Sequence, residues 1–183
     1  LDRMVYCRAG VGKNRLIAVT EGFSMDEVSF RNVETDDIAL LEYWYSMTDR
    51  LGYATGFRNF ADVKDRLLSG PVISRMIVIN GSQPVGFLCF ELRSLDRVKA
   101  AYIHIMMIDP LFQNRGIGTQ AAEKLLKFLA SHGASAVLLS VHRQNKRGLK
   151  FWESLGFRQL PAMEKMTAFS GTNEATILQK SLT

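Results

Sequence analysis

The hydrophobic residues of this chain fall into short runs that predict an ordered series of strands and helices. Period-two or compact apolar runs predict strands at 28–33, 75–80, 85–93, 100–108 and 136–142. Helical spacing of apolar residues predicts helices near 35–48, 61–68, 119–131 and 146–155. Two later runs, 163–169 and 175–182, predict a closing pair of strands. The predicted order is β-α-α-β-β-β-α-β-α-β-β.

Local signals place the ends of several of these elements. Thr35 followed by Asp36 and Asp37 predicts a helix start, with the threonine as its cap and acidic residues in the first turn. The apolar face of that helix comprises Ile38, Leu41, Trp44, Tyr45 and Thr48. The runs at 75–80 and 85–93 are joined by a Gly-Ser-Gln-Pro segment, which predicts a β-hairpin.

The first 26 residues stand apart from this series. Short apolar runs at 4–7 and 15–20 predict a hairpin there, although these residues are also consistent with an extension foreign to the natural chain. Gly12-Lys13 is not part of a Walker A loop, because Asn14 stands where that motif needs Ser or Thr. We therefore divide the chain into an N-terminal extension, 1–26, and a single domain, 27–183.

Composition narrows the class of protein. The 183 residues are 47% hydrophobic and 22% charged, as in an ordinary globular protein with one core. No apolar run approaches the roughly 20 residues of a membrane helix, and no secretory signal is evident. Two cysteines, Cys7 and Cys89, are too few for a disulfide scaffold, and no Cys/His spacing suggests a metal site. We expect a cytoplasmic protein with no metal.

The charge distribution favours an anionic ligand near one part of the chain. The net charge is +5, and no acidic residue occurs between Glu123 and Glu153. The basic residues in that interval are Lys124, Lys127, Arg143, Lys146, Arg147 and Lys150. For the last three, contact with a phosphate and a solvated helix face are both open interpretations.

The strand at 100–108 leads into a glycine-bearing turn and then a helix. Gly116 and Gly118 lie just before that helix, where unpaired N–H groups and the helix dipole favour a phosphate. The segment fits the dinucleotide pattern GxGxxA, but no acidic residue follows about 20 positions later to hold a ribose. A hairpin-linked series of strands also precedes the turn, which argues against a parallel mononucleotide-binding fold.

Residues 27–183 resemble the GNAT superfamily of N-acetyltransferases. The family's acyl-CoA turn, Q/R-x-x-G-x-G/A, is met by Gln113, Gly116 and Gly118. The strand ending in Asp109-Pro110 matches a second family feature, and Asn145 followed by Leu155-Gly156-Phe157 matches a third. The resemblance implies an α/β (α+β) fold with a mixed, mostly antiparallel sheet of about seven strands flanked by about four helices.

The resemblance also implies an acetyl-CoA site. The backbone N–H groups of the turn would hold the pyrophosphate, and the backbone of the preceding strand would pair with the pantetheine arm. Asn145 would contact the pantetheine or the acyl end. The implied cofactor-binding residues are Met106, Met107, Ile108, Asn114, Arg115, Gly116, Ile117, Gly118, Thr119 and Asn145.

The catalytic positions depart from the family pattern. Trp152 stands where many members have a tyrosine that protonates the leaving thiolate, and an indole is not a usable acid. Ser140 and Tyr102 stand at two positions where members place a general-base glutamate. Trp152 is then expected in the core or in the wall of an acyl pocket.

Two residues of the strand at 100–108 are candidate replacements. Strict alternation puts Tyr102, His104 and Met106 on one face, the face that addresses the acceptor in this family. His104 is a candidate base, because its reference pKa is near 6.5, and Tyr102 is a candidate acid or relay. Each is also consistent with a packed residue of the sheet. Glu91 and His142 are weaker candidates.

We predict an acetyl-CoA-dependent N-acetyltransferase whose acceptor is a small-molecule or protein amine. A non-catalytic acyl-CoA-binding or regulatory module on the same fold is the alternative, because Trp152 and Ser140 replace the usual acid and base. Neither nucleic-acid nor membrane binding is expected, since the chain offers only charge for either. A monomer and a homodimer both remain open.

Overall fold

The computed structural model describes residues 27–47, 60–61, 64–69, 71–95, 98–160 and 175–182. The hairpin predicted at 4–7 and 15–20, the strand predicted at 163–169 and Thr48 lie outside these residues. Within them, no helix is long and apolar enough to cross a membrane.

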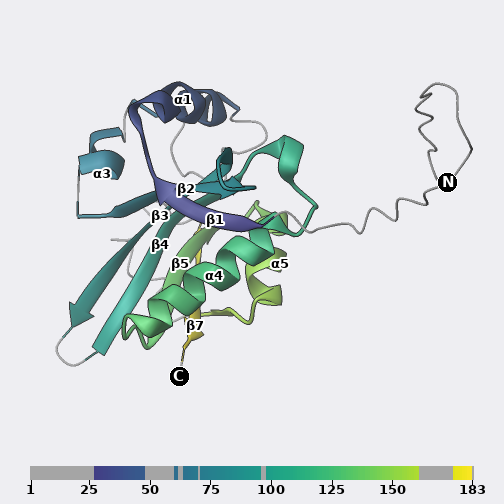
Figure 1. The fold of residues 1–183 in the computed structure, drawn as a ribbon. Coiled ribbons are helices and arrows are strands. Elements are labelled where there is room, and N and C mark those ends of the chain that lie inside the picture. Colours follow the sequence, from purple (N-terminus) through teal and green to yellow (C-terminus); the bar gives the residue numbers. More distant parts are fainter. Residues whose placement is uncertain are drawn as a thin grey trace, which may run out of the picture.

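The described residues form one seven-stranded sheet with four α-helices (Figure 1). The strands are β1 (Val28–Asn32), β2 (Ile73–Ile79), β3 (Gln83–Leu95), β4 (Val98–Ile108), β5 (Ala136–His142), β6 (Arg158–Gln159) and β7 (Ala175–Ser181). The helices are α1 (Ile38–Ser46), α3 (Lys64–Ser69), α4 (Ile117–Ser131) and α5 (Lys146–Ser154), with short 3-10 turns at Thr35–Asp37 and Pro110–Phe112. The predicted fold class, a mostly antiparallel sheet of seven strands with four helices, is confirmed.

The strand order in the sheet is β1-β2-β3-β4-β5-β7-β6. Every neighbouring pair is antiparallel except β4 and β5, which are parallel because α4 connects them. The hairpin of β2 and β3 forms as predicted, with Asn80 and Gly81 both at positive φ in its turn. The predicted closing strand 175–182 corresponds to β7, which pairs with β5 on one side and β6 on the other.

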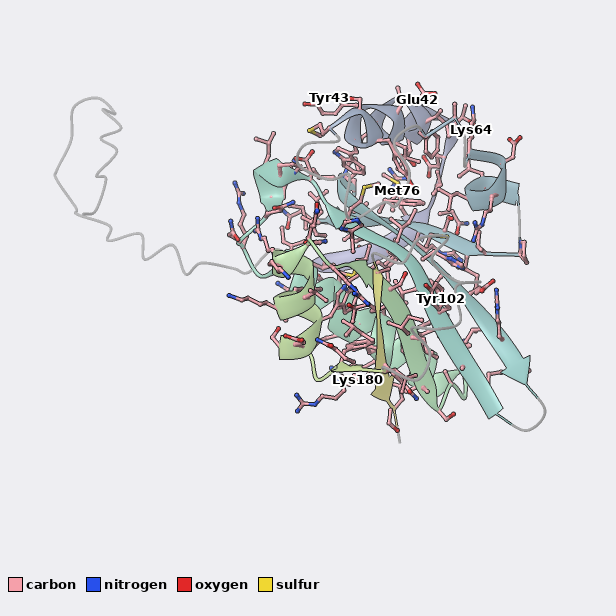
Figure 2. The ribbon with its side chains drawn as sticks, turned by 180° about the vertical axis from the view of Figure 1, so that it is seen from behind. Glu42, Tyr43, Lys64, Met76, Tyr102 and Lys180 are labelled. Carbon is pink, nitrogen blue, oxygen red and sulfur yellow. The ribbon has the colours of Figure 1, made fainter. Side chains whose placement is uncertain are left out.

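Two apolar layers hold the helices to opposite faces of the sheet. The first layer contains Ala121, Leu125 and Leu129 of α4 with Leu88 and Phe90 of the sheet. The second layer packs α1 and α3 against the other face, through Leu41, Trp44, Tyr45 and Leu67 over Met76, Phe87, Cys89, Ile105 and Met107. Figure 1 shows α4 and α5 together on one side and α1 and α3 on the other, and Figure 2 shows Met76 next to α1.

The start of the first helix differs from its prediction. The chain passes through the turn Thr35–Asp37 before α1 begins, and Glu34 rather than Thr35 is the N-cap of that turn, in a capping box with Asp37. Asp37 accepts from the Glu34 N–H at 2.8 Å and from both terminal nitrogens of Arg31 at 2.6 and 2.7 Å. Arg31 holds the pKa of Asp37 below its usual range. The prediction of the cap missed this ion pair, because Arg31 lies on the preceding strand.

One glycine of β3 is required for the close approach of β4. A Cβ on Gly86 would lie 2.3 Å from the carbonyl oxygen of Met107, and backbone atoms there cannot yield without separating the strands. Gly86→Ala is therefore expected to lower the free energy of unfolding by about 1–3 kcal/mol, as overpacking does elsewhere. Urea denaturation measures the change, and an unaltered transition midpoint would contradict this account of the strand contact.

Candidate functional site

The parallel strands β4 and β5 separate part of the way along the sheet. Their register runs only from Ala100↔Ala136 to Ile103↔Leu139. Beyond that point a cleft of about 390 Å³ opens between them, within the size range of small-molecule sites. Its lining includes Met106, Met107 and Ile108 of β4, Leu139, Ser140 and Val141 of β5, the turn before α4, and Asn145, Arg147, Gly148, Phe151 and Trp152 near α5.

The turn between β4 and α4 is built to expose backbone N–H groups. Gly116 is the N-cap of α4 at φ 78°, and no side chain caps the helix there. The first N–H groups of α4 therefore have no partner within the helix and stand beside the cleft, at the positive end of the helix dipole. Asn114 is also at positive φ (62°), and Gln113 Nε2 donates to the Ile108 carbonyl at 2.8 Å. The turn thus presents backbone donors of the kind that bind an anion.

Residues at the start of α5 close the cleft from the other side. Asn145 caps α5 through its Oδ1, which accepts from the Gly148 N–H at 2.8 Å. Arg147 donates to Asn114 Oδ1 at 2.6 Å, so a guanidinium spans from α5 to the glycine turn. The cleft therefore has a cationic side chain as well as backbone donors at the same end.

A second polar contact ties helix α1 to the base of the same turn. Trp44 Nε1 donates to Asp109 Oδ2 at 2.8 Å in a buried site, and Asp109 Oδ1 accepts from the Leu111 N–H at 2.8 Å. Because Asp109 immediately follows β4, α1 and the entry to the glycine turn are held in a fixed relation.

A β-bulge at His104 changes which side chains of β4 share a face. Cys89 pairs with Ile105 and Phe90 pairs with Ile103, so His104 is an extra residue on β4. Ile103 and Met106 consequently pack on the α4 side, while Ile105 and Met107 pack on the side of α1 and α3. The prediction that Tyr102, His104 and Met106 share a face is therefore wrong for Met106. Tyr102 and His104 do lie together, with ring centroids 4.9 Å apart.

His104 lines the cleft and lies within a small charged network. Its Nε2 is 3.4 Å from Glu91 Oε1, and its Nδ1 is 3.5 Å from a terminal nitrogen of Arg66. Burial lowers the pKa of His104, while Glu91 opposes that shift and Arg66 and Arg93 add to it. A neutral ring with its proton on Nε2 fits both neighbours, since Nδ1 then accepts from Arg66.

The Tyr102 hydroxyl links β4 to β5 where the two strands begin to separate. It donates to Ser140 Oγ at 3.0 Å, and Ser140 itself lines the cleft. Burial raises the pKa of Tyr102, so the phenol keeps its proton at neutral pH. Figure 2, seen from behind α4, shows Tyr102 on the β4 ribbon. The hydroxyl pair places an exchangeable proton at the wall of the cleft.

The structure brings most of the predicted cofactor-binding residues together in this cleft. Those that line it are Met106, Met107, Ile108, Asn114, Gly116, Gly118, Thr119 and Asn145. Arg115 instead stacks over Phe112, and the Ile117 side chain is buried in the core, so neither side chain lines the cleft. Of the weaker candidates, Glu91 contacts His104, whereas His142, at the end of β5, is not among the lining residues.

The sequence does not indicate that β5 forms one wall of the cleft or that Arg66 lies beside His104. The sequence marks Ser140 only by the absence of a glutamate, whereas its position next to the cleft comes from the pairing of β5 parallel to β4. Arg66 lies on α3, and nothing in the sequence indicates that this short helix reaches a residue 38 positions later. Trp152 is buried in the core beside Phe157, as expected, and it also lines the cleft.

The cleft suits an elongated ligand with an anionic group at the α4 end. Among the described residues, no three His, Cys, Asp or Glu side chains are placed to hold a metal ion. Donors for an anion lie at the glycine turn, and the polar residues Ser140 and His104 lie where the strands separate.

Comparison with known proteins points in the same direction. The model of the acetyltransferase (GNAT) family matches residues 36–157. An uncharacterized N-acetyltransferase of Methanocaldococcus jannaschii is 34% identical over 84 residues, which are 44% of this chain and 37% of that protein. The chain thus spans well under two thirds of that relative.

Solved structures share the fold at low sequence identity. A domain from Methanocaldococcus jannaschii superimposes with a TM-score of 0.68 at 18% identity, over 85% of this chain and 99% of that one. The N-acetylglutamate synthase of Neisseria gonorrhoeae, determined with coenzyme A and N-acetylglutamate, gives a TM-score of 0.62 at 17% identity over 86% of this chain and 35% of that one. At such identities the likeness concerns the fold.

Proposed function

The chain belongs to the acetyltransferase (GNAT) family, and we propose that it transfers an acetyl group from acetyl-CoA to a primary amine. The observation that carries the proposal is the opening of β4 from β5 directly beside the uncapped start of α4. That combination offers unpaired strand backbone and unpaired helix N–H groups along one cleft.

The residues present fit acetyl-CoA. The N–H groups at the start of α4 and the Arg147 guanidinium would hold the pyrophosphate. Backbone groups of β4 that β5 leaves unpaired after Ile103 would pair with the amides of the pantetheine arm. Asn145 already uses its Oδ1 as a helix cap, so its amide nitrogen is the group that would donate to the ligand.

When bound, acetyl-CoA supplies a thioester whose carbonyl carbon forms a bond to the amine nitrogen while the carbon–sulfur bond breaks, giving an N-acetyl amide and the CoA thiol. His104 accepts the proton that the amine loses at Nδ1, the ring nitrogen that carries no proton, where the amine takes the place of the 3.5 Å contact from Arg66. Burial keeps His104 neutral and therefore able to accept that proton. Glu91, 3.4 Å from Nε2, stabilises the imidazolium that forms.

Tyr102 and Ser140 provide the proton for the departing thiolate. Ser140 lines the cleft, and its hydroxyl is replenished by the Tyr102 hydroxyl 3.0 Å away. Because a phenol with a raised pKa is a weak acid, orientation of the two substrates carries most of the rate. This assignment gives a proton source to a site in which Trp152 stands where a tyrosine is usual.

The pH dependence of kcat/KM follows from the state of His104. A base acts when neutral, so kcat/KM rises as pH rises through the pKa of His104, which burial sets below its ordinary 6.5. The groups facing the ring are Glu91, which raises this pKa, and Arg66 and Arg93, which lower it. After correction for ionisation of the amine, we expect an acid limb below pH 6.5 that moves lower in Glu91→Gln. A limb above pH 7 that is insensitive to Glu91→Gln would contradict the assignment.

A panel of primary amines tests the proposed activity. Purified protein is incubated with acetyl-CoA and small amines, amino acids, peptides with free N-termini or lysine peptides, and both thiol release and the acetylated product are measured. We expect product with at least one amine class. Binding of acetyl-CoA without product across the whole panel would favour the alternative, a non-catalytic acyl-CoA-binding module.

A further inference from the structure

Among the described residues, the charged groups around His104 carry an excess of positive charge. Glu91 Oε1 lies 2.5 Å from a terminal nitrogen of Arg93 and 3.4 Å from His104 Nε2, so this one carboxylate already has a guanidinium partner. Arg66 brings a second guanidinium to within 3.5 Å of His104 Nδ1. With His104 neutral, the two arginines and one carboxylate leave a net charge of +1 beside the candidate base.

Arg66 is the cation that this network leaves without a counter-ion. Among the described residues, no carboxylate lies within 4 Å of its guanidinium. Its contact with His104 is at the outer limit of hydrogen-bond length, and Arg66 is an exposed residue. Asp65 precedes it in α3, but adjacent residues of a helix point in different directions. Figure 2 locates α3 through the labelled Lys64.

The position of Arg66 puts this charge on the acceptor's path rather than on that of acetyl-CoA. The cofactor groups lie on the side of α4 and α5, whereas Arg66, Glu91 and the Tyr102–His104 pair lie toward α1 and α3. An amine that reaches the thioester at His104 from that side passes within contact distance of the Arg66 guanidinium.

We propose that the acceptor is a primary amine that also carries a carboxylate close to the amino group, and that Arg66 binds this carboxylate. The proposal rests on the proposed acetyltransferase function. Guanidinium matches carboxylate geometry with two parallel N–H donors. The same positive charge repels an acceptor with a second ammonium group, so lysine side chains and polyamines are disfavoured. Arg66 therefore acts as a specificity-determining residue.

Matched pairs of acceptors test the proposal. Acetylation by wild type is measured as kcat/KM for glycine against glycinamide, for alanine against alaninamide, and for a peptide amide beginning with Asp against one beginning with Asn. The first two pairs report free amino acids and the third an acidic peptide N-terminus. Glycinamide has the less basic amine, so a site indifferent to the carboxylate favours the amide.

Two substitutions complete the design. Arg66→Gln removes the charge, and Lys127→Gln removes a charge of the same sign from an exposed position on α4, across the sheet. At a pH above the acid limb, where His104 is neutral with or without Arg66, we expect Arg66→Gln to lower kcat/KM for the preferred carboxylated amine about tenfold more than for its neutral partner, mainly through KM. Lys127→Gln should change neither. Arg66→Lys, which keeps the charge but not the fork, should be intermediate.

The outcomes separate this proposal from the function on which it rests. A preference for the carboxylated member of a pair that disappears in Arg66→Gln supports the proposal. The proposal is overturned if wild type acetylates the amides as well as the acids, or if Arg66→Gln keeps the preference for the acids. Either result leaves the acetyltransferase function standing. Absence of product from every amine overturns both. Thermal denaturation of each variant establishes that a loss of activity is not a loss of folding.

Discussion

Replacement of His104 by alanine is expected to lower kcat/KM for amine acetylation by about 10²- to 10⁴-fold, the usual contribution of a general base. The loss should fall mainly in kcat, because the ring acts on the proton that leaves the amine and not on binding of acetyl-CoA. It should be largest near neutral pH and shrink at high pH, where more of the amine is already deprotonated. Steady-state kinetics across about pH 6–9 measure all three features.

His142→Ala is the matched control for this prediction. It removes a second imidazole, at the end of β5 outside the cleft lining, and should leave kcat/KM unchanged. The dissociation constant for CoA should be the same in wild type, His104→Ala and His142→Ala. An unchanged kcat/KM in His104→Ala over the whole pH range would remove His104 from the reaction.

Gly118→Ala should separate stability from cofactor binding. The nearest protein atoms to a Cβ at this position lie 3.6–3.7 Å away, on Phe151 and Ile108, which is ordinary contact. Alanine also suits a helix better than glycine by up to about 1 kcal/mol, so the variant should be as stable as wild type or more so. The added methyl group projects into the cleft lining at the start of α4. If the pyrophosphate lies against that backbone, CoA affinity should fall about 10- to 100-fold through weakened charge-assisted hydrogen bonds.

Calorimetric titration with CoA and thermal denaturation, carried out on the same preparation, test this prediction. Gly81→Ala is a useful comparison, because Gly81 lies in the β2–β3 turn at φ 81°, away from the cleft, and nothing lies within 4 Å of its added Cβ. There the expected pattern is reversed, with reduced stability from backbone strain and unchanged CoA affinity. Undiminished CoA affinity in Gly118→Ala would mean that the pyrophosphate does not approach α4 at this residue.

The order of elements was predictable because each is encoded by its own local pattern. Ala136–His142 forms β5 within the predicted limits, and the helix after Gly116 begins two residues earlier than predicted. The glycine turn was equally accessible, since Gly116 and Gly118 stand directly before the helical pattern, and the structure has Gly116 as a left-handed N-cap. These features depend on neighbours in sequence, which a pattern records.

The features that the sequence predicted wrongly or did not indicate depend on contacts between residues distant in sequence. At His104 the pairing of β3 with β4 leaves one extra residue on β4, and no glycine or proline in the sequence marks this bulge. Strict alternation therefore assigned Met106 to the wrong face. The approach of Arg66 to His104 likewise arises from packing of α3 on the sheet. Whether Tyr102 and His104 act in catalysis stays a prediction, although the structure places the two rings side by side.

The central claim is that acetyl-CoA binds in the cleft between β4 and β5. A crystal structure of the protein with CoA tests it most directly. The account predicts the pyrophosphate at the N–H groups that begin α4, the pantetheine arm along β4 beyond Ile103, and the sulfur near His104 and Ser140. CoA bound elsewhere, such as in the groove between β1 and α3 lined by Asn32, Leu67 and Arg75, with the β4–β5 cleft empty, would contradict it.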